Sequence, residues 1–357
     1  MLRVLIAALF CLLVAAAPAP AAERAPKGWL GAMADGPLLD QGFTGRSAEY
    51  DLMVRSGVGG VRISVPWAIM QPERDGRIDY SVVDIVLEQT APRGIDVLPA
   101  VTSVPAWAAR HPGDPNSPPD GTAGYVGFVE ALVRRYGPGG SFWAERSHLP
   151  AQPIRQWQIW NEPNMGFAWS DQPFAADYVA LLRASRERIK QVDPGAQVLL
   201  AGLVGRSWQG LSKIYAAGGH GLFDAVAIHP FTLKPDNTLK ILRRVRKVMV
   251  ANGDGSTPMQ LTELSWPAAK GKRVKFTMGF ETTEGGQASR LADVLPRLLE
   301  VRRRYRIGGV YWLTWISQAS PSIDNDPFAF AGLRYLGNGG AVGSRPALEV
   351  YDRFARR

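Results

Sequence analysis

Residues 154–164 read IRQWQIWNEPN and combine a strand-like run with an abrupt polar end. The first seven residues are rich in aromatic and branched side chains, which favours a buried β-strand. The run ends at Asn161 and Glu162, and Pro163 cannot donate a backbone hydrogen bond that would continue a strand. The pattern therefore predicts a carboxylate at the point where a strand gives way to a loop, which is where parallel α/β barrels carry their reactive groups.

Residues 258–267, which read PMQLTELSWP, repeat this arrangement further along the chain. A short strand-like run leads to Glu263 and then stops at Trp266 and Pro267. The sequence therefore contains two strands that each deliver one carboxylate, and both carboxylates are candidates for a single active site.

The chain has 357 residues and 46% hydrophobic content, which suits one large α/β domain or two smaller ones. The expected strands cover residues 28–33, 59–67, 95–105, the stretch from 154, 197–204, 223–231, 259–265 and 309–317. The expected helices cover residues 47–56, 78–93, 125–136, 175–192, 209–217, 238–251, 287–305 and 345–354. No change in composition marks a domain boundary between them.

This alternation of eight strands with helices implies a parallel sheet. A doubly wound sheet is the competing architecture, but no expected strand leads into a glycine-rich phosphate turn. Glu162 and Glu263 are 263 − 162 = 101 residues apart on the fourth and seventh strands, so each of the three units averages about 34 residues. That period predicts an α/β fold with a single (β/α)8 (TIM) barrel over residues 23–357, with both glutamates on its carboxyl-terminal rim.

Residues 1–22 have the pattern of a secretory signal peptide, with Arg3 before an apolar run and small residues around 19–21. The apolar run is too short to span a bilayer, so we expect cleavage near Ala21 or Ala22, no stable membrane insertion, and a secreted or periplasmic protein. The only cysteine, Cys11, lies in this segment. Its removal would leave no disulfide and no thiolate metal site.

The formal net charge of +9 raises the question of a polyanionic partner. Much of the excess lies in two runs, which are Lys240, Arg243, Arg244, Arg246 and Lys247, and then Arg302, Arg303, Arg304 and Arg306. In the first run the bases alternate with apolar residues at helical spacing, and in the second they fall at the end of a helix-like segment. We interpret both as solvated basic surface; an acidic polysaccharide or a cell-surface partner is the alternative.

The two glutamates suit one particular chemistry. Glycosidic bonds are commonly cleaved by two carboxylic acids, one protonating the leaving oxygen and one attacking or activating water. Because a buried, unpaired carboxylate is costly, a glutamate inside an apolar strand needs partners or a chemical role. Glu162 alone is equally well explained as a satisfied carboxylate on the rim, and it is Asn161 beside it and the matching Glu263 that favour catalysis.

Trp160-Asn161-Glu162-Pro163-Asn164 resembles the acid/base signature on the fourth strand of clan A glycoside hydrolases, and Thr262-Glu263 resembles their nucleophile motif on the seventh. Further matching positions fall in order along the chain at Arg62, Pro105-Ala106-Trp107, His229-Pro230 and Tyr311-Trp312. Within the clan, family 39 and its bacterial exopolysaccharide-hydrolase relatives are the most similar. The resemblance covers essentially all of residues 23–357.

This resemblance implies that Glu162 is the acid/base and Glu263 the nucleophile. Asn161 would hydrogen-bond the 2-hydroxyl of the sugar, Arg62 would keep Glu263 ionised, and His229 would line the site. A structural ion pair is the alternative for Arg62, and a capping or core histidine is the alternative for His229. Many clan members carry a tyrosine two places after this histidine, whereas this chain has a phenylalanine at position 231.

The eleven tryptophans form a second line of evidence, because sugar rings stack on aromatic planes. Five of them fall near expected strand ends, namely Trp67, Trp107, Trp169, Trp266 and Trp312. Trp312 matches a strand-eight tryptophan of the clan, and Trp315 is its alternate. A tryptophan taken singly is more often a packing residue than a sugar platform. The acidic loop at Asp324, Asn325 and Asp326 is interpreted as a solvated turn rather than as a calcium or substrate site.

Other chemistries have little support in the sequence. The four histidines show no HExxH or comparable spacing, and no G-x-S-x-G elbow occurs. We therefore expect an exported, retaining glycoside hydrolase that acts on a polysaccharide or oligosaccharide without a cofactor or metal and does not bind nucleic acid. The alternatives are a carbohydrate-binding pseudoenzyme of the cell envelope and, on charge alone, a binder of nucleic acid or envelope polyanions.

Overall fold

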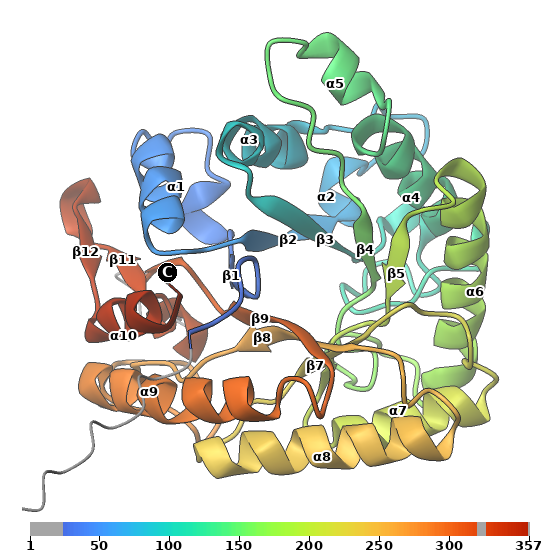
Figure 1. The fold of residues 1–357 in the computed structure, drawn as a ribbon. Coiled ribbons are helices and arrows are strands. Elements are labelled where there is room, and N and C mark those ends of the chain that lie inside the picture. The colour runs from blue at the N-terminus through green and yellow to red at the C-terminus, as the bar shows by residue number, and fades with distance from the viewer. Residues whose placement is uncertain (1–23, 320–325, 356–357) are drawn as a thin grey trace, which may run out of the picture.

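The computed structural model describes residues 24–319 and 326–355. Nine strands in this part of the chain form one parallel sheet in the order β5-β4-β3-β2-β1-β9-β8-β7-β6 (Figure 1). They are β1 (Leu30–Met33), β2 (Gly60–Pro66), β3 (Asp96–Thr102), β4 (Gln156–Ile159), β5 (Gln197–Leu199), β6 (Leu203–Val204), β7 (Val226–His229), β8 (Met259–Leu264) and β9 (Ile307–Trp312).

This sheet closes into a barrel because its two end strands are parts of one strand. β5 and β6 stand at opposite ends of the sheet order, yet only residues 200–202 separate them in the chain. Leu199 forms a parallel bridge with Ala225 just before β7, and β6 continues the pairing with β7. Counting β5 and β6 together gives eight barrel strands in the described residues, so the predicted (β/α)8 architecture is confirmed.

Helices surround the barrel on its outside, as Figure 1 shows. The α-helices are α1 (Arg46–Arg55), α2 (Trp67–Met70), α3 (Ser81–Thr90), α4 (Ala123–Tyr136), α5 (Ser141–Glu145), α6 (Ala175–Val192), α7 (Ser207–Ala216), α8 (Pro235–Ala251), α9 (Glu284–Val301) and α10 (Pro346–Ala355). Short 3-10 helices lie at Gly36–Leu38, Ala91–Arg93, Ala106–Ala108, Pro327–Phe330 and Asn338–Gly340. Each of the eight predicted helices is present within a few residues of its expected bounds. None of the described helices is long and apolar enough to cross a membrane.

The amphipathic pattern of α8 explains how a basic helix packs on the barrel. Leu242, Val245 and Met249 are buried, while the bases at 240, 243, 244 and 247 are exposed as expected for a solvated face. Arg246 corrects that expectation, because it is only 7% exposed. Its guanidinium donates to the carbonyl oxygens of Gly255, Thr257 and Tyr305, so this base ties the helix to the loops below the barrel.

A second, three-stranded sheet was not predicted. It consists of β10 (Ile316–Gln318), β11 (Arg334–Leu336) and β12 (Val342–Ser344), with β10 and β11 parallel and β11 and β12 antiparallel. The strand expected over residues 309–317 is therefore two strands, since β9 ends at Trp312. Buried Glu49 on α1 fixes the small sheet to the barrel, because its carboxylate accepts hydrogen bonds from both Trp315 and Arg334.

Several sequence-based predictions lie outside the described residues. These are the signal peptide at residues 1–22 with its Cys11, and the acidic loop positions Asp324 and Asn325. Asp326 is described, and its side chain accepts a hydrogen bond from the backbone N–H of Phe328 at the start of a 3-10 helix. For Asp326 the structure therefore shows a helix cap, which agrees with the turn interpretation.

Candidate active site

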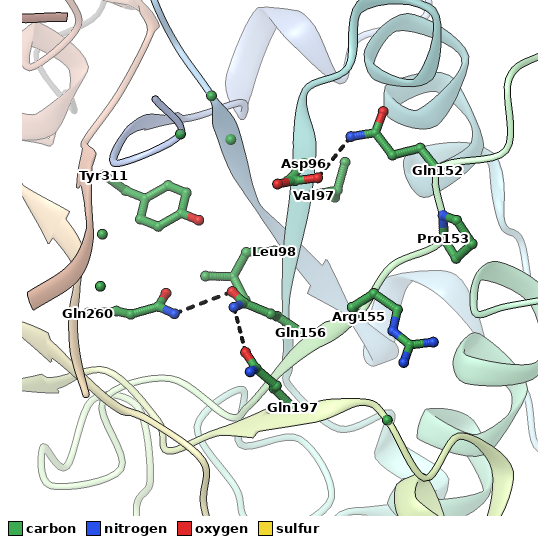
Figure 2. A pocket seen from close by; sticks show the side chains of 16 residues that line it. Asp96, Val97, Leu98, Gln152, Pro153, Arg155, Gln156, Gln197, Gln260 and Tyr311 are labelled. Atoms are coloured by element: carbon green, nitrogen blue, oxygen red, sulfur yellow. Dashed lines mark hydrogen bonds between the residues drawn. The ribbon is translucent and has the colours of Figure 1, made fainter. Parts of the chain in front are cut away.

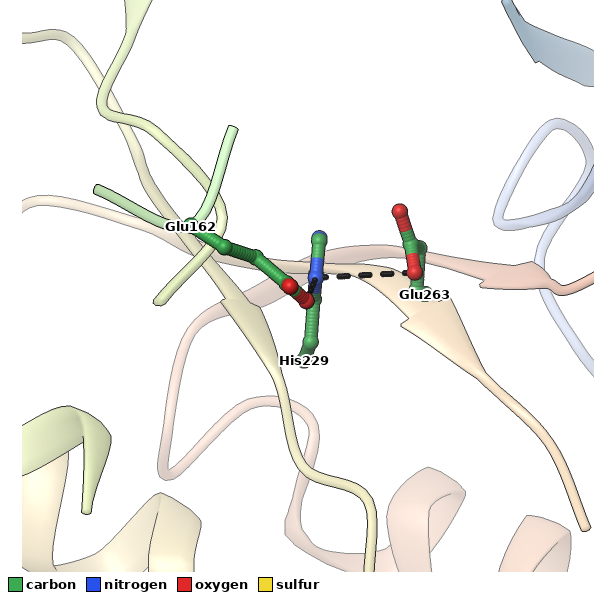
Figure 3. A group of neighbouring side chains, drawn as sticks. All are labelled: Glu162, His229 and Glu263. Atoms are coloured by element: carbon green, nitrogen blue, oxygen red, sulfur yellow. Dashed lines mark hydrogen bonds and ion pairs between the residues drawn. The ribbon is translucent and has the colours of Figure 1, made fainter. Parts of the chain in front are cut away.

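Five side chains predicted for the site meet at the carboxyl-terminal rim of the barrel. Arg62 comes from β2, Asn161 and Glu162 follow β4, His229 ends β7, and Glu263 lies near the end of β8. Figure 3 shows Glu162, His229 and Glu263 converging from their separate strands. One carboxylate oxygen from each glutamate and one ring nitrogen of the histidine all lie within 4.8 Å of one another. The barrel thus brings together two carboxylates that are 101 residues apart in sequence.

The backbone that presents Glu162 is in an uncommon conformation. Trp160 has φ +68° and Glu162 has φ +49°, so two non-glycine residues on either side of Asn161 occupy the left-handed region. Hydrogen bonds hold this turn, from the Trp160 N–H to the Val101 carbonyl at 3.0 Å and from the Glu162 N–H to the Gly202 carbonyl at 3.0 Å. Such strain costs about 1–3 kcal/mol per residue and is concentrated at functional sites, which is consistent with a turn built to aim a side chain.

Arg62 is the centre of the polar network beneath the site. It is 2% exposed, and its Nη1 donates to Glu263 Oε1 at 2.7 Å. Its Nη2 donates to Asn161 Oδ1 at 2.8 Å, and its Nε donates to Gln158 Oε1 at 3.1 Å. One buried guanidinium therefore pairs with the charge of Glu263 and also fixes the orientation of Asn161. The contact with Glu263 is the one that the sequence analysis expected, whereas the contact with Asn161 was not predicted.

Glu162 has a different environment, although it lies close to Glu263. It is 8% exposed, and burial raises its pKa to about 7, with the positive charge of Arg62 acting in the opposite direction. Its Oε1 lies 2.6 Å from His229 Nδ1. Near neutral pH this carboxyl group can therefore hold a proton that an exposed glutamate would have lost.

His229 can match either protonation state of Glu162. Burial lowers the pKa of His229 to about 4, so its ring is neutral near pH 7. Its Nε2 lies 3.0 Å from Thr262 Oγ1, and this hydroxyl can either donate or accept. When Glu162 is protonated it donates to Nδ1, and when it is ionised the other tautomer donates from Nδ1 while Thr262 donates to Nε2. The histidine is thus hydrogen-bonded to both neighbours in either state.

Gly202 makes room for this histidine, and this gives a first testable prediction. A Cβ at position 202 would lie 2.0 Å from His229 Nε2, so the ring must move in Gly202→Ala and release Glu162 or Thr262. Because catalytic geometry is sensitive to displacements of about 1 Å, we expect kcat/KM on any hydrolysed glycoside to fall about 100-fold. Gly166→Ala is the matched control, since nothing lies within 4 Å of its Cβ position. Equal activity of the two variants would show that the position of His229 does not matter.

A pocket of about 220 Å³ opens beside the nucleophile candidate. Its polar lining residues are Arg62, Ser64, Thr102, Ser103, Asn116, Asn161 and Glu263. Hydroxyl and amide groups in this number can donate to and accept from several ligand hydroxyls at once. The pocket therefore provides a polar receptor for a hydroxylated ligand directly beside one of the two carboxylates.

Most of the tryptophans predicted as sugar platforms are packing residues in this structure. Trp169, Trp266 and Trp312 are at most 2% exposed, as is Trp67, so none presents a ring face to a ligand. Buried polar contacts explain two of them, since Trp266 Nε1 donates to the Thr232 carbonyl and Trp312 Nε1 donates to the Ala331 carbonyl. The alternate, Trp315, is also fully buried and donates to Glu49.

Trp107 is the predicted platform that keeps part of its side chain accessible. Its Nε1 donates to the Gln71 carbonyl at 3.2 Å, and the Arg74 guanidinium lies 5.5 Å from its ring centroid. It lines a separate pocket of about 220 Å³ together with Asp120 and Gly121. Trp107 therefore does not line the pocket beside Glu263.

Phe231 occupies the position where a tyrosine was expected. Its ring stacks on Phe280 at a centroid distance of 5.6 Å and contacts Phe328 at 5.1 Å. A phenyl ring donates no hydrogen bond, so the described polar partners of Glu263 are Arg62 at 2.7 Å and His229 Nδ1 at 3.6 Å. The aromatic cluster shows that this position serves packing next to the site.

Sequence reasoning missed two polar groups beneath the site. Gln158 accepts from Arg62 and donates to the Trp160 carbonyl at 2.9 Å, so it supports the strained turn. Asp35 follows β1, accepts a hydrogen bond from the Thr314 hydroxyl, and has a pKa raised by burial. Gln158 could have been found, because it is a polar residue between apolar neighbours in the run 156–160. No sequence pattern distinguishes Asp35 from an ordinary loop aspartate.

The same three side chains also have the composition of a metal site. Glu162, His229 and Glu263 each offer one ligand atom within a radius that a divalent cation could bridge. Arg62, however, already places a buried positive charge 2.7 Å from Glu263. A second cation would meet this charge in a region of low dielectric constant, so the donor set fits acid and base chemistry better than metal binding.

Comparisons with known proteins identify the fold class. No protein-family model and no curated protein sequence matches the chain. Among solved structures, a family 39 glycoside hydrolase from Bacteroides cellulosilyticus WH2 is similar with a TM-score of 0.68 at 19% identity, over 91% of this chain and 63% of that one. A monomeric beta-xylosidase from Caulobacter crescentus CB15 gives 0.63 at 18%, over 93% and 69%.

A GH5_18 protein from Bifidobacterium longum subsp. longum, solved in complex with Manb1-4GlcNAc, gives a TM-score of 0.64 at 18% identity, over 92% of this chain and 77% of that one. The chain spans less than two thirds of the length of the Bacteroides protein. At these identities the likeness shows the fold alone. The fold is the TIM barrel that these glycoside hydrolases share.

Proposed function

We propose that this protein is a retaining glycoside hydrolase in which Glu263 is the nucleophile and Glu162 the acid/base. The observation that carries the proposal is the contrast between two neighbouring carboxylates. Glu263 is paired with buried Arg62 at 2.7 Å, whereas burial raises the pKa of Glu162 to about 7. Two neighbouring carboxyl groups in such different environments, one ion-paired and one desolvated, are the usual basis for assigning a nucleophile and an acid.

The separation of the two groups favours the retaining mechanism. Carboxyl groups about 5–5.5 Å apart suit a covalent intermediate, whereas inverting enzymes need about 6.5–9.5 Å to admit a water molecule. In this protein an oxygen of Glu162 and an oxygen of Glu263 lie within 4.8 Å of one another. This nearest approach is shorter than the separation that inverting enzymes need.

The proposed reaction has two steps. In the first, a Glu263 carboxylate oxygen forms a bond to the anomeric carbon while the glycosidic C–O bond breaks and the leaving oxygen takes the proton of Glu162. In the second, Glu162, now ionised, accepts a proton from water, whose oxygen displaces Glu263 from the anomeric carbon. His229 Nδ1 lies 2.6 Å from Glu162 Oε1, where a neutral ring can accept from the protonated carboxyl group or donate to the ionised one.

Asn161 and Arg62 prepare the sugar-binding side of this reaction. Asn161 Oδ1 accepts from Arg62 Nη2, which leaves the amide NH₂ of Asn161 available to donate to a sugar hydroxyl. The 220 Å³ pocket beside Glu263, with its hydroxyl groups, is where that sugar ring would bind. We propose a polysaccharide or oligosaccharide as substrate, in keeping with the family 39 glycoside hydrolase and the beta-xylosidase that share the fold.

We also propose that the protein is exported and acts outside the cytoplasm. This part rests on residues 1–22 alone, through their basic start, apolar run and small residues near 19–21. Amino-terminal sequencing of the protein recovered from the medium or periplasm of the producing cell tests it. A start near residue 22 or 23 is the expected result, and recovery of the intact chain from the cytoplasm would contradict it.

The stereochemical outcome is the decisive test of the proposed mechanism and our second prediction. The purified protein is first screened on polysaccharides and aryl glycosides, and the first-formed anomer from a hydrolysed substrate is then followed by proton NMR. Because two displacements at the anomeric carbon restore its configuration, the product should keep the configuration of the substrate. An inverted first product would contradict Glu263 as a covalent nucleophile.

A carbohydrate-binding protein without turnover is the second candidate. Two observations favour it, namely that both glutamates are only 8% exposed and that Trp169, Trp266 and Trp312 offer no platform at the rim. Saturable binding of an oligosaccharide that is never cleaved over the whole substrate panel, by wild-type protein between pH 4 and 9, would favour this candidate. Turnover of any substrate that is lost in Glu263→Gln would exclude it.

A further inference from the structure

A second cavity lies at the opposite end of the barrel from the two glutamates. It has a volume of about 420 Å³, and its lining comes from the first residues of six strands and the segments just before them. The contributing positions are Gly60 of β2, Asp96 of β3, Gln156 of β4, Gln197 of β5, Gln260 of β8 and Gly308 and Gly309 of β9. Because all strands are parallel, these amino-terminal ends form one rim, and Figure 2 looks into the mouth that they surround.

This hollow departs from the usual interior of the fold. Barrels of this type fill their interior with layers of bulky, mostly branched side chains and form a packed core. Here glycines replace such side chains at Gly31, Gly60 and Gly309, all of which lie against Tyr311. A Cβ at position 31 would lie 2.6 Å from Tyr311 Cδ1 and would push that ring out of place. The glycines thus make room for the ring of Tyr311 at one wall of the cavity.

Three glutamine side chains cross the cavity as a hydrogen-bonded chain. Gln260 Nε2 donates to Gln156 Oε1 at 3.3 Å, and Gln156 Nε2 donates to Gln197 Oε1 at 2.8 Å. Figure 2 shows these three amides directed toward one another inside the mouth, with the Tyr311 hydroxyl pointing into the same space. At the rim, Gln152 Nε2 donates to Asp96 Oδ1 at 2.9 Å. These bonds preset the orientation of each amide before any ligand arrives.

The chain of amides leaves polar groups that nothing in the described residues satisfies. Gln260 is 6% exposed, and its buried Oε1 has no hydrogen-bond partner. An acceptor left in this state costs about 1–3 kcal/mol, and a ligand that turned this amide toward the cavity and donated to it would recover that cost. The Tyr311 hydroxyl lines the same cavity and makes no hydrogen bond within the part of the chain that the structure describes. An acceptor and a donor are therefore available on two neighbouring strands, β8 and β9.

We propose that this cavity is a second binding site, for a small neutral polyhydroxylated molecule of about monosaccharide size. Amide and phenol groups both donate and accept, which matches the dual character of alcohol hydroxyls. The charged lining residues, Asp96 and Arg155, are one of each sign, so the cavity does not select an anion or a cation. Its volume falls within the roughly 300–1,000 Å³ of small-molecule sites. The site is separate from the catalytic rim, and the proposal does not depend on the proposed hydrolase activity.

The test uses saturation-transfer difference NMR on the purified chain with D-glucose as the probe. Glucose could also enter the catalytic rim, so four variants separate the two ends of the barrel. Gln260→Leu removes the free acceptor at similar volume, and Gly309→Val fills the mouth from a strand position where a Cβ meets only ordinary contacts, Tyr311 Cε2 being 3.5 Å away. Asn161→Ala alters the catalytic rim alone, and Gln209→Leu is the matched control at an exposed glutamine of α7.

The expected result is a saturable glucose signal that survives in Asn161→Ala and Gln209→Leu but is at least about tenfold weaker in Gln260→Leu and Gly309→Val. Hydrolysis of any substrate should be unchanged in Gln260→Leu, since that side chain lies at the far end of the barrel. D-glucuronate should bind more weakly than glucose. The negative charge of Asp96 offsets the attraction of Arg155 for its carboxylate, which would still lose water on entering the cavity. A signal lost only in Asn161→Ala, no saturable signal in wild type, or equal binding of glucuronate would each overturn the proposal.

Discussion

Glu263→Gln should abolish hydrolysis of every substrate, with a fall in kcat of at least about 10⁴-fold. The amide cannot form the bond to the anomeric carbon, and no improvement in the leaving group replaces a missing nucleophile. The measurement is initial rate on both a natural oligosaccharide and an aryl glycoside with a good leaving group. Glu73→Gln is the matched control, because Glu73 is an exposed glutamate that does not line the pocket beside Glu263. It should keep wild-type activity.

Folding has to be separated from chemistry in this variant. Removing the charge of Glu263 leaves Arg62 buried with neutral partners, and breaking a buried pair in this way costs about 3–5 kcal/mol. Circular dichroism and a melting curve at the assay temperature show whether the variant is folded. In the smaller variant Glu263→Ala, added azide should restore turnover of the aryl glycoside and give a glycosyl azide of inverted configuration. Activity of folded Glu263→Gln near that of wild type would exclude Glu263 as the nucleophile.

The parts of this site that could be predicted from sequence are those fixed by strand periodicity. Glu162 and Glu263 each end a strand-like run, and the carboxyl ends of parallel strands must share one rim, so the 101-residue separation was enough to bring them together. Arg62 could be predicted for the same reason, as a charge interrupting an apolar strand. In a parallel barrel, the position of a residue along its strand therefore predicts at which end of the barrel it lies.

The parts that could not be predicted depend on the segments that cover the strands. Trp266 and Trp312 were expected at the substrate because they lie at strand ends, but both rings are buried, and Trp266 Nε1 donates to the carbonyl of Thr232 in the segment after β7. Trp312 Nε1 donates to the carbonyl of Ala331, which lies just before β11 of the unpredicted small sheet. The periodicity of a strand places a residue at the rim, whereas its exposure depends on non-local packing, which no single-sequence pattern encodes.

The glutamines of the barrel interior show an intermediate case. Gln156 and Gln158 alternate within one strand, so period-two spacing predicts that both face the same side. One of them supports Arg62 near the catalytic rim and the other joins the amide chain of the opposite mouth. The alternating glutamines are compatible with polar side chains that face the inside of the barrel. The same pattern is found in a half-buried strand whose polar side chains face the solvent. Only closure of the barrel decides between the two.

Glu162→Gln should remove the basic limb of the pH profile and lower activity about 10²- to 10⁴-fold on substrates with poor leaving groups. The proposed mechanism needs Glu162 protonated in the free enzyme, and burial raises its pKa to about 7. Wild-type kcat/KM should therefore fall as pH rises through about 7. Glutamine cannot lose a proton, so the residual activity on an aryl glycoside with a good leaving group should stay level above that pH. Wild-type activity on a natural sugar with the basic limb intact would show that Glu162 is not the acid.

The same substitution should make the protein more stable at alkaline pH, although it lowers activity. The reason is that burial penalises the ionised form of Glu162, which a glutamine cannot adopt. A group whose pKa is raised on folding stabilises the protein at low pH and loses that contribution as pH rises through its folded value. Between pH 5 and pH 8 the free energy of unfolding of Glu162→Gln, relative to wild type, should thus increase by about 2–3 kcal/mol. Burial lowers the pKa of His229 to about 4, so the contribution of this histidine to the free energy of unfolding rises with pH. Both proteins contain His229, so this contribution cancels in the difference between them. Urea titrations at the two pH values give this difference directly.

A variant that is less active yet more stable at alkaline pH would show that the protein maintains this carboxyl group at a cost to its stability, which is expected of a catalytic acid and not of a structural ion pair.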